Sequence, residues 1–127
     1  MNTATLHQRL VAETLGTALL LATVVGSGIM GERLAGGNMA IALLANAIAT
    51  GAALYALNST FGAISGAHFN PLVTLIECLE GHLPKREAAL YGSCQIIGAL
   101  LGVLAAHAMF ELPLLQASPH VRTGMPQ

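Results

Sequence analysis

The fold is decided by the stretch Ser65-Gly66-Ala67-His68-Phe69-Asn70-Pro71-Leu72-Val73-Thr74, which lies between long apolar segments without being one itself. Asn70 followed by Pro71 predicts the start of a helix, because Asn is a preferred N-cap and Pro is tolerated at the first helical position. The apolar run 72–79 then predicts a helix of about ten residues, roughly 15 Å long, against a hydrocarbon core of ~30 Å. Such a helix is too short to span a bilayer.

A helix that enters a membrane only halfway leaves backbone groups unpaired at membrane depth. This is permitted only where those groups are buried in protein or face a water-filled cavity. The side-chain oxygen of Asn70 can accept from the N–H of Leu72 or Val73, which leaves the two amide hydrogens free to point into a lumen. With the positive end of the helix dipole behind them, these hydrogens favour a neutral solute with lone pairs and oppose a cation or an excess proton. The alternative is an Asn-Pro turn that opens an ordinary surface helix.

The composition is that of a membrane protein. Of the 127 residues, 54% are hydrophobic and 9% are charged, and the mean hydropathy is +0.68. Soluble domains carry about 25% charged residues. We therefore expect a single all-α integral membrane domain, residues 1–127, with the lipid bilayer as its first partner. The formal net charge of −1 and the lack of a basic run predict no nucleic-acid partner.

The sequence carries no pattern for catalysis or for a cofactor. Cys78 and Cys94 lie in or beside apolar segments without CxxC spacing, so we interpret both as small apolar residues. The histidines show no HxxxH or HExxH pairing; they are His7, His68, His82, His107 and His120. We expect no catalytic residue, no metal site and no cofactor, and therefore no enzyme.

Apolar runs and turn residues divide the chain into spans. We expect three transmembrane helices at about 10–29, 39–57 and 88–110, a re-entrant loop and half-helix at 65–79, and a tail at 111–127. Positively charged residues are usually more frequent on the cytoplasmic side of a membrane protein. Three of them, Arg9, Lys85 and Arg86, lie on the side of the amino terminus, and two, Arg33 and Arg122, lie on the other side. This small excess favours a cytoplasmic amino terminus only weakly.

Two polar residues inside these spans require an explanation. A carboxylate within a span is costly and usually faces the bundle interior with a partner, so Glu13 is expected to do the same. The alternative is that Glu13 lies near the headgroups, close to Arg9. Gln95 offers a hydrogen bond across helices.

The motif around Asn70 resembles the first Asn-Pro-Ala loop of the major intrinsic protein family, the aquaporins and glycerol facilitators, with Leu72 where Ala is usual. Two further motifs are similar to parts of that family: Ala12-Glu13-x-Leu15-Gly16-Thr17 resembles the start of its first helix, and Tyr91-x-x-x-Gln95-x-x-Gly98-Ala99-x-x-Gly102 resembles its third helix. The tail is similar to the loop that joins the family's two halves, from Glu111-Leu112-Pro113 to Arg122-Thr123-Gly124. The resemblance covers nearly the whole chain but only the first half of the family's architecture.

The resemblance implies which residues line a pore. The carbonyl groups of the loop would form a ladder of acceptors, and the Asn side chain would be the donor at its end. Glu13 would brace the backbone of this loop, and Gln95 is a second expected support. The loop histidine is expected to fix the loop, the alternative being a proton relay. The pore-lining residues implied in this way are Gly66, Ala67, His68, Phe69, Asn70 and Pro71.

Thr50 lies twenty residues before Asn70, where the family places the second-helix member of its narrowest constriction. Water-strict channels and glycerol facilitators usually carry an aromatic residue there. A threonine at this position therefore implies a wider pore that also admits small uncharged solutes, such as glycerol, urea or metalloid hydroxides. The alternative is a threonine that hydrogen-bonds its own i−4 carbonyl.

We therefore expect half of a channel for passive movement of water or small neutral solutes, in a bacterial-type inner (plasma) membrane. Channels of this type consist of two inverted repeats, so a second half-channel or a second copy, in a homo-oligomer, is needed to close the pore. The sequence stops where a fourth helix should begin, which indicates truncation or ancestral loss. The alternatives are a non-conducting membrane interaction or assembly protein, a remnant, or a small dual-topology exporter.

Overall fold

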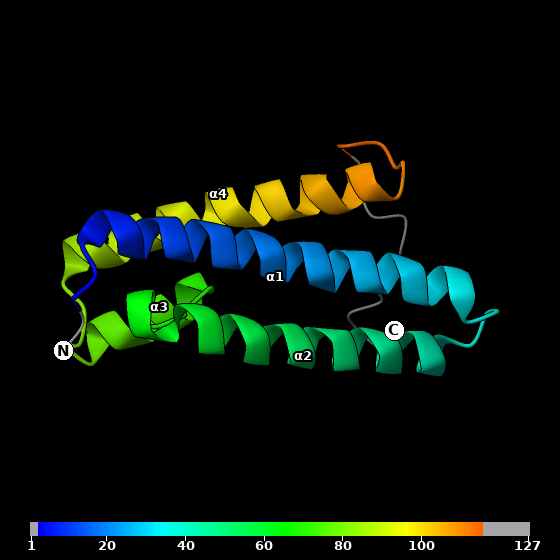
Figure 1. Cartoon of the computed structure of the whole chain (residues 1–127), viewed down its shortest axis with the longest axis horizontal. Helices are drawn as coiled ribbons and strands as arrows, with labels where there is room; N and C mark the ends of the chain where they lie inside the picture. The colour runs from blue at the N-terminus through cyan, green and yellow to red at the C-terminus, as the bar shows by residue number, and fades with distance from the viewer. Residues whose placement is uncertain (1–2, 116–127) are drawn as a thin grey trace, which may run out of the picture.

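The computed structural model describes residues 3–115, which form four helices and no strand within that range (Figure 1). The helices are α1 (Leu6–Leu34), α2 (Met39–Ser65), α3 (Pro71–Leu79) and α4 (Lys85–Met109). The all-α fold with one short helix between long ones is confirmed. Most of the tail expected at 111–127 lies outside the described residues.

The long helices extend beyond the apolar runs because their ends are capped further out. Thr5 caps α1 in a reciprocal pair with Gln8, in which each side chain accepts from the other residue's backbone N–H. Asn38 caps α2 by accepting from two backbone N–H groups. Residues 58–64, which lie between the span expected at 39–57 and the loop expected from 65, continue α2, and the helix ends only where Gly66 adopts a left-handed conformation.

Helix length separates three helices that can cross a membrane from one that cannot. α1, α2 and α4 contain 29, 27 and 25 residues, and all three are long and apolar enough to span. At 1.5 Å per residue they are roughly 38–44 Å long, against ~30 Å of hydrocarbon. α3 has 9 residues, about 14 Å, so it reaches only halfway.

α1 is the central helix and packs against both α2 and α4 (Figure 1). α1 and α4 run in the same direction, α2 runs in the opposite one, and α3 packs against α4 near the start of that helix. The contact between α1 and α4 is close, because a Cβ atom at Gly98 or Gly102 would collide with the backbone carbonyl of Thr14 or Ala18. Small residues at such positions let two membrane helices approach backbone to backbone.

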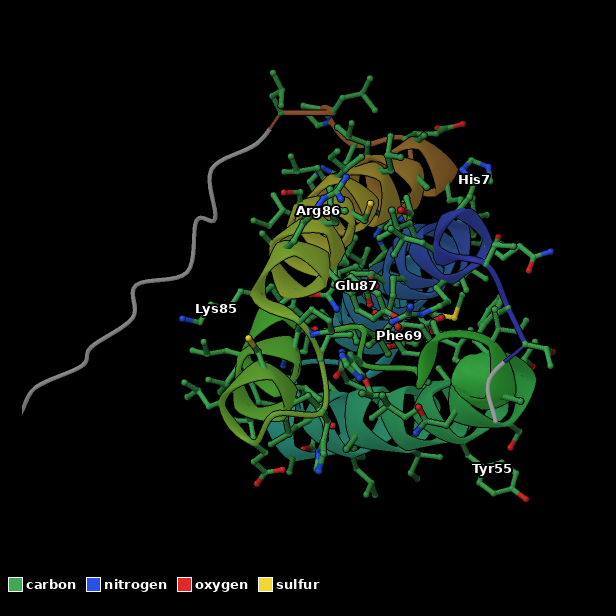
Figure 2. The ribbon with its side chains drawn as sticks, turned by 90° about the vertical axis from the view of Figure 1, so that its left-hand side faces the viewer. His7, Tyr55, Phe69, Lys85, Arg86 and Glu87 are labelled. Carbon is green, nitrogen blue, oxygen red and sulfur yellow. The ribbon has the colours of Figure 1, made fainter. Side chains whose placement is uncertain are left out.

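The distribution of side chains is the reverse of that in a soluble domain. The largest fully buried side chains are Tyr91, Gln95, Glu13, Thr17 and Thr74. Large apolar side chains lie outside, and Figure 2 shows Tyr55 pointing away from the bundle. In water such a surface would be a very large exposed apolar patch, whereas lipid or further protein covers it at no such cost. The fold is thus that of a membrane domain with a polar centre.

The close α1–α4 contact predicts that Gly98→Leu lowers the free energy of unfolding by about 1–3 kcal/mol, since the added side chain forces the helices apart. Thermal unfolding of the chain in detergent, followed by circular dichroism, measures the effect. Gly92→Leu is the matched control on the same helix, because a Cβ at Gly92 has nothing within 4 Å. Equal losses in the two variants would contradict the proposed packing.

Candidate functional site

The loop between α2 and α3 has a strained backbone. Gly66 has φ 89°, and Ala67 and Phe69 have φ 52° and φ 51°. Residues other than glycine rarely adopt this left-handed conformation, which costs on the order of 1–3 kcal/mol each and persists only where the surroundings impose it. The loop must therefore be held by contacts from other elements.

Glu13 of α1 supplies the main contacts that hold the loop. Its Oε1 accepts from the backbone N–H of His68 at 3.0 Å and from the hydroxyl of Ser65 at 2.7 Å. Its Oε2 accepts from the backbone N–H of Phe69 at 2.8 Å and from Nε2 of Gln95 at 2.8 Å. The side chain is completely buried, and four donors satisfy it, as a buried charge requires. A carboxylate on the first span thus fixes the loop from behind.

The side chain of Phe69 anchors the loop against the same face of α1. Its ring lies against Gly16, where a Cβ atom would overlap the ring. The ring of Phe61 on α2 meets it edge to face, with centroids 6.1 Å apart. Phe69 is nearly fully buried, and Figure 2 shows it in the middle of the bundle. Phe69 is therefore held by its N–H and by its ring.

A chain of hydrogen bonds leads from Glu13 to the ring of His68. Nε2 of Gln95 also lies 2.9 Å from Oγ1 of Thr74, and that hydroxyl lies 2.9 Å from Nδ1 of His68. A carboxylate only accepts, so the Gln95 atom that faces it is the amide NH₂, which then donates to Thr74 as well. The Thr74 hydroxyl is left to donate to Nδ1, which assigns the proton of a neutral imidazole to Nε2. This geometry favours the structural role expected for His68.

A second set of contacts ties α1 to α4 at the end of the molecule where the loop lies. The Tyr91 hydroxyl donates to the backbone carbonyl of Ser65 at 2.8 Å and accepts from Nε of Arg9 at 3.0 Å. Arg9 also pairs with Glu87 at 2.9 Å. The Arg9 side chain is therefore engaged with α4, whereas the Glu13 carboxylate is hydrogen-bonded to the loop and to Gln95.

The polar residues that face one another across α1 and α4 form two stripes, with members four residues apart, which puts each stripe on one helix face. The α1 stripe is Arg9, Glu13 and Thr17, and the α4 stripe is Glu87, Tyr91 and Gln95. Thr17 is part of the stripe by position only, because its buried hydroxyl has no hydrogen-bond partner among the described residues. The sequence predictions named two of these as supports and gave no role to the others, nor to Ser65 and Thr74. The repeated spacing of polar residues in otherwise apolar helices is the signal that would have found them.

The loop also presents polar atoms that have no partner among residues 3–115. None of the hydrogen bonds in that range goes to the carbonyl oxygens of Gly66, Ala67, His68 or Phe69. Asn70 caps α3 by accepting from the N–H of Leu72 at 2.9 Å. In the same range its amide nitrogen has no partner, so the loop offers a row of acceptors followed by a donor.

A cavity of about 400 Å³ opens beside this loop. Its lining is rich in polar and charged groups, which come from α1, the end of α2, the loop, α3, the turn that follows α3, and α4; they include Arg9, Ser65, His68, Glu77, His82 and Tyr91.

Thr50 lies apart from the network around Glu13. Its hydroxyl is 3.5 Å from Oδ1 of Asn46, and Nδ2 of Asn46 donates to the carbonyl of Val24 on α1 at 2.9 Å. The partner of Thr50 is thus a side chain and not the i−4 carbonyl considered as the alternative. The structure brings Glu13, Gln95 and the loop together, with Thr50 on the long helix that leads to them.

Comparisons with known proteins agree with this geometry. The sequence model of the family described as "Major intrinsic protein" matches residues 1–124. The chain is 52% identical over 122 residues to Aquaglyceroporin AqpS of Rhizobium meliloti (strain 1021), which covers 96% of this chain and 52% of that protein. It is 30% identical over 106 residues to Aquaporin NIP6-1 of Arabidopsis thaliana, covering 84% of this chain and 34% of that protein. The chain therefore spans about half, or less, of the length of these curated relatives.

The bonds to Glu13 predict that Glu13→Gln loosens the loop. The donors now bond to two carboxylate oxygens, whereas the amide of Gln has a single acceptor oxygen. The stability of the loop should fall by about 1–3 kcal/mol, so the amide protons of His68 and Phe69 should exchange roughly tenfold faster or more. Hydrogen exchange of the chain in detergent measures this. Glu111→Gln, at an exposed position, is the control. Unchanged protection in Glu13→Gln would refute the bracing role.

Proposed function

Because this chain belongs to the major intrinsic protein family, we propose that residues 3–115 form one half of the wall of a membrane channel for water or small neutral solutes. Membership of this family points to a channel in a membrane and not to an enzyme. The observation that carries the proposal is the row of carbonyl oxygens at 66–69, followed by the amide nitrogen of Asn70, all of which have no hydrogen-bond partner within the described range 3–115. Polar atoms left open at membrane depth are tolerated where they line a water-filled passage.

The arrangement of these atoms determines what can pass. Carbonyl oxygens accept hydrogen bonds from the hydroxyl or water hydrogens of a solute, and the Asn70 amide donates to its lone pairs. The N-terminal end of α3 adds a partial positive charge at the same point, which opposes cations and excess protons. The pore would therefore conduct neutral molecules that can both donate and accept.

The proposed pore needs a second wall. α3 buries Thr74 alone of its nine side chains, and Leu72 and Leu75 are more than half exposed in the described structure. A half-helix at membrane depth needs protein around its tip, and channels of this type supply it from an inverted second repeat. We propose that a second half-channel, or a second copy of this chain, packs against that face. Leu72 would lie at the junction.

Thr50 supports a wider solute class than water alone. It is half-buried, and its side chain is small compared with an aromatic residue. The relative from Rhizobium meliloti is named an aquaglyceroporin, a name that covers both water and glycerol. Glycerol, urea and metalloid hydroxides are the candidate solutes, and a bacterial plasma membrane is the proposed location.

Asn70→Asp tests conduction separately from folding. Aspartate also caps helices, so α3 should still form, while the amide donor is replaced by a negative charge. We expect the solute permeability of proteoliposomes that contain the full chain to fall roughly tenfold or more, toward that of empty vesicles. Stopped-flow light scattering measures the swelling, and circular dichroism checks the helix content.

Asn38→Asp is the matched control, because Asn38 caps α2 in the same way outside the proposed pore. It should leave permeability unchanged. Wild-type vesicles that swell no faster than empty ones would instead favour a non-conducting membrane assembly protein. Equal permeability of the wild type and Asn70→Asp would show that Asn70 does not line the pore.

Thr50→Phe tests the proposed constriction. The larger side chain should reduce glycerol permeability several-fold more than water permeability, because glycerol needs the greater width. The same swelling assay, run with osmotic gradients of glycerol and of sucrose, gives both values. Ile48→Phe, two residues away and largely exposed, is the control. Equal changes in water and glycerol permeability would show that Thr50 does not select by size.

A further inference from the structure

Glu77, Glu80 and His82 come together where α3 ends and the chain turns toward α4. Their ligand atoms all lie within 4.8 Å of one another. Nδ1 of His82 is 3.0 Å from Oε2 of Glu77 and 3.6 Å from Oε2 of Glu80. The three side chains are between 36% and 63% exposed. An ion could therefore reach them from water without any opening of the fold.

The two carboxylates are placed where negative charge is unfavourable. Glu77 and Glu80 are three residues apart, in the last turn and at the C-cap of α3. They repel each other there, and both face the negative end of the helix dipole. Within residues 3–115 neither forms an ion pair with a Lys or Arg, and Figure 2 shows Lys85, at the start of α4, pointing away from the bundle. A cation held between them would relieve both costs.

We propose that these three side chains bind a divalent transition-metal ion of the Zn²⁺ class. Zinc bonds to imidazole nitrogen and carboxylate oxygen are about 2.0–2.2 Å long. In a tetrahedron of that size the ligand atoms are roughly 3.4 Å apart, and the two separations to Nδ1 lie on either side of this value. Three protein ligands leave the fourth position to water.

The donor set distinguishes this ion from the alkaline-earth cations. Ca²⁺ takes six to eight oxygen ligands, and Mg²⁺ is bound through oxygen atoms in octahedral geometry. An imidazole with two carboxylates suits Zn²⁺ and its neighbours in the first transition row. The site has no HxxxH or HExxH spacing in the sequence. It forms because the turn after α3 places His82 next to Glu77.

The proposed metal site lies at the edge of the cavity beside the loop. Glu77 and His82 also line the cavity of about 400 Å³ beside the loop. A bound ion would join the C-terminal end of α3 to the turn before α4 and would place a positive charge at the rim of that cavity. We infer that the metal site regulates access to the cavity, an inference that rests on the proposed channel function; the binding itself does not.

Titration of Zn²⁺ alone into the full chain in detergent, followed by calorimetry, tests the binding. The chain is purified without a histidine tag. We expect one ion per chain at this site, and an affinity at least tenfold lower in His82→Ala and in Glu77→Gln. His7→Ala, at an exposed histidine outside the cluster, should bind as the wild type does. Circular dichroism confirms that the exposed substitutions leave the helices intact.

Three outcomes would overturn the site: no Zn²⁺ binding by the wild type, equal affinity in wild type and His82→Ala, or displacement of Zn²⁺ by equimolar Ca²⁺. A fourth measurement addresses the regulation. Zn²⁺ should lower the swelling rate of wild-type proteoliposomes and leave that of His82→Ala unchanged. Binding without this effect would refute the regulatory inference and retain the site, whereas vesicles that conduct nothing without Zn²⁺ would count against the channel.

Discussion

The structure depends on the hydrogen bonds between the Glu13 carboxylate and two backbone N–H groups of the loop. A non-helical segment at membrane depth cannot leave its N–H groups open to lipid. Glu13 accepts from His68 and Phe69, so both N–H groups are satisfied, while the carbonyl groups at 66–69 have no hydrogen-bond partner among residues 3–115. The left-handed conformations of Ala67 and Phe69 are the strain that accompanies this arrangement.

The long helices place the carboxylate where it is needed. Glycines on α4 let α1 approach at backbone distance, which brings Gln95 within reach of Glu13. One helical turn further out, Tyr91 and Arg9 make a second link between the same helices and hold Ser65. Most of the polar groups at the centre therefore bond to one another, although the buried Thr17 hydroxyl and the Gln95 Oε1 have no partner among the described residues, and the large apolar side chains remain outside for lipid or protein.

The half-helix could be predicted from the sequence because its signals are local: an Asn N-cap, a Pro at the next position and a short apolar run. The ends of α1 and α2 differ from the apolar runs, because helices continue through polar residues until a cap stops them. Of the support for the loop, Glu13 and Gln95 stood out as polar residues within spans. The four-residue spacing marks Tyr91 as a polar-face residue, but the partners of its hydroxyl depend on how α4 is rotated against α1. The Glu77–His82 contact depends on a turn that no local pattern determines.

The bonds that hold the loop join residues far apart in the chain, with separations of 55, 56 and 82 positions from Glu13. During synthesis the first helix is complete long before Gln95 exists, and the loop emerges before α4. The segment 66–70 therefore cannot reach its final shape on its own, since its strained residues need Glu13 of α1, and the bonds from Tyr91 and Gln95 of α4 are added last. Insertion of the third long helix is thus the event that completes the loop, and a chain stopped before it would leave the buried carboxylate with an unfinished set of partners.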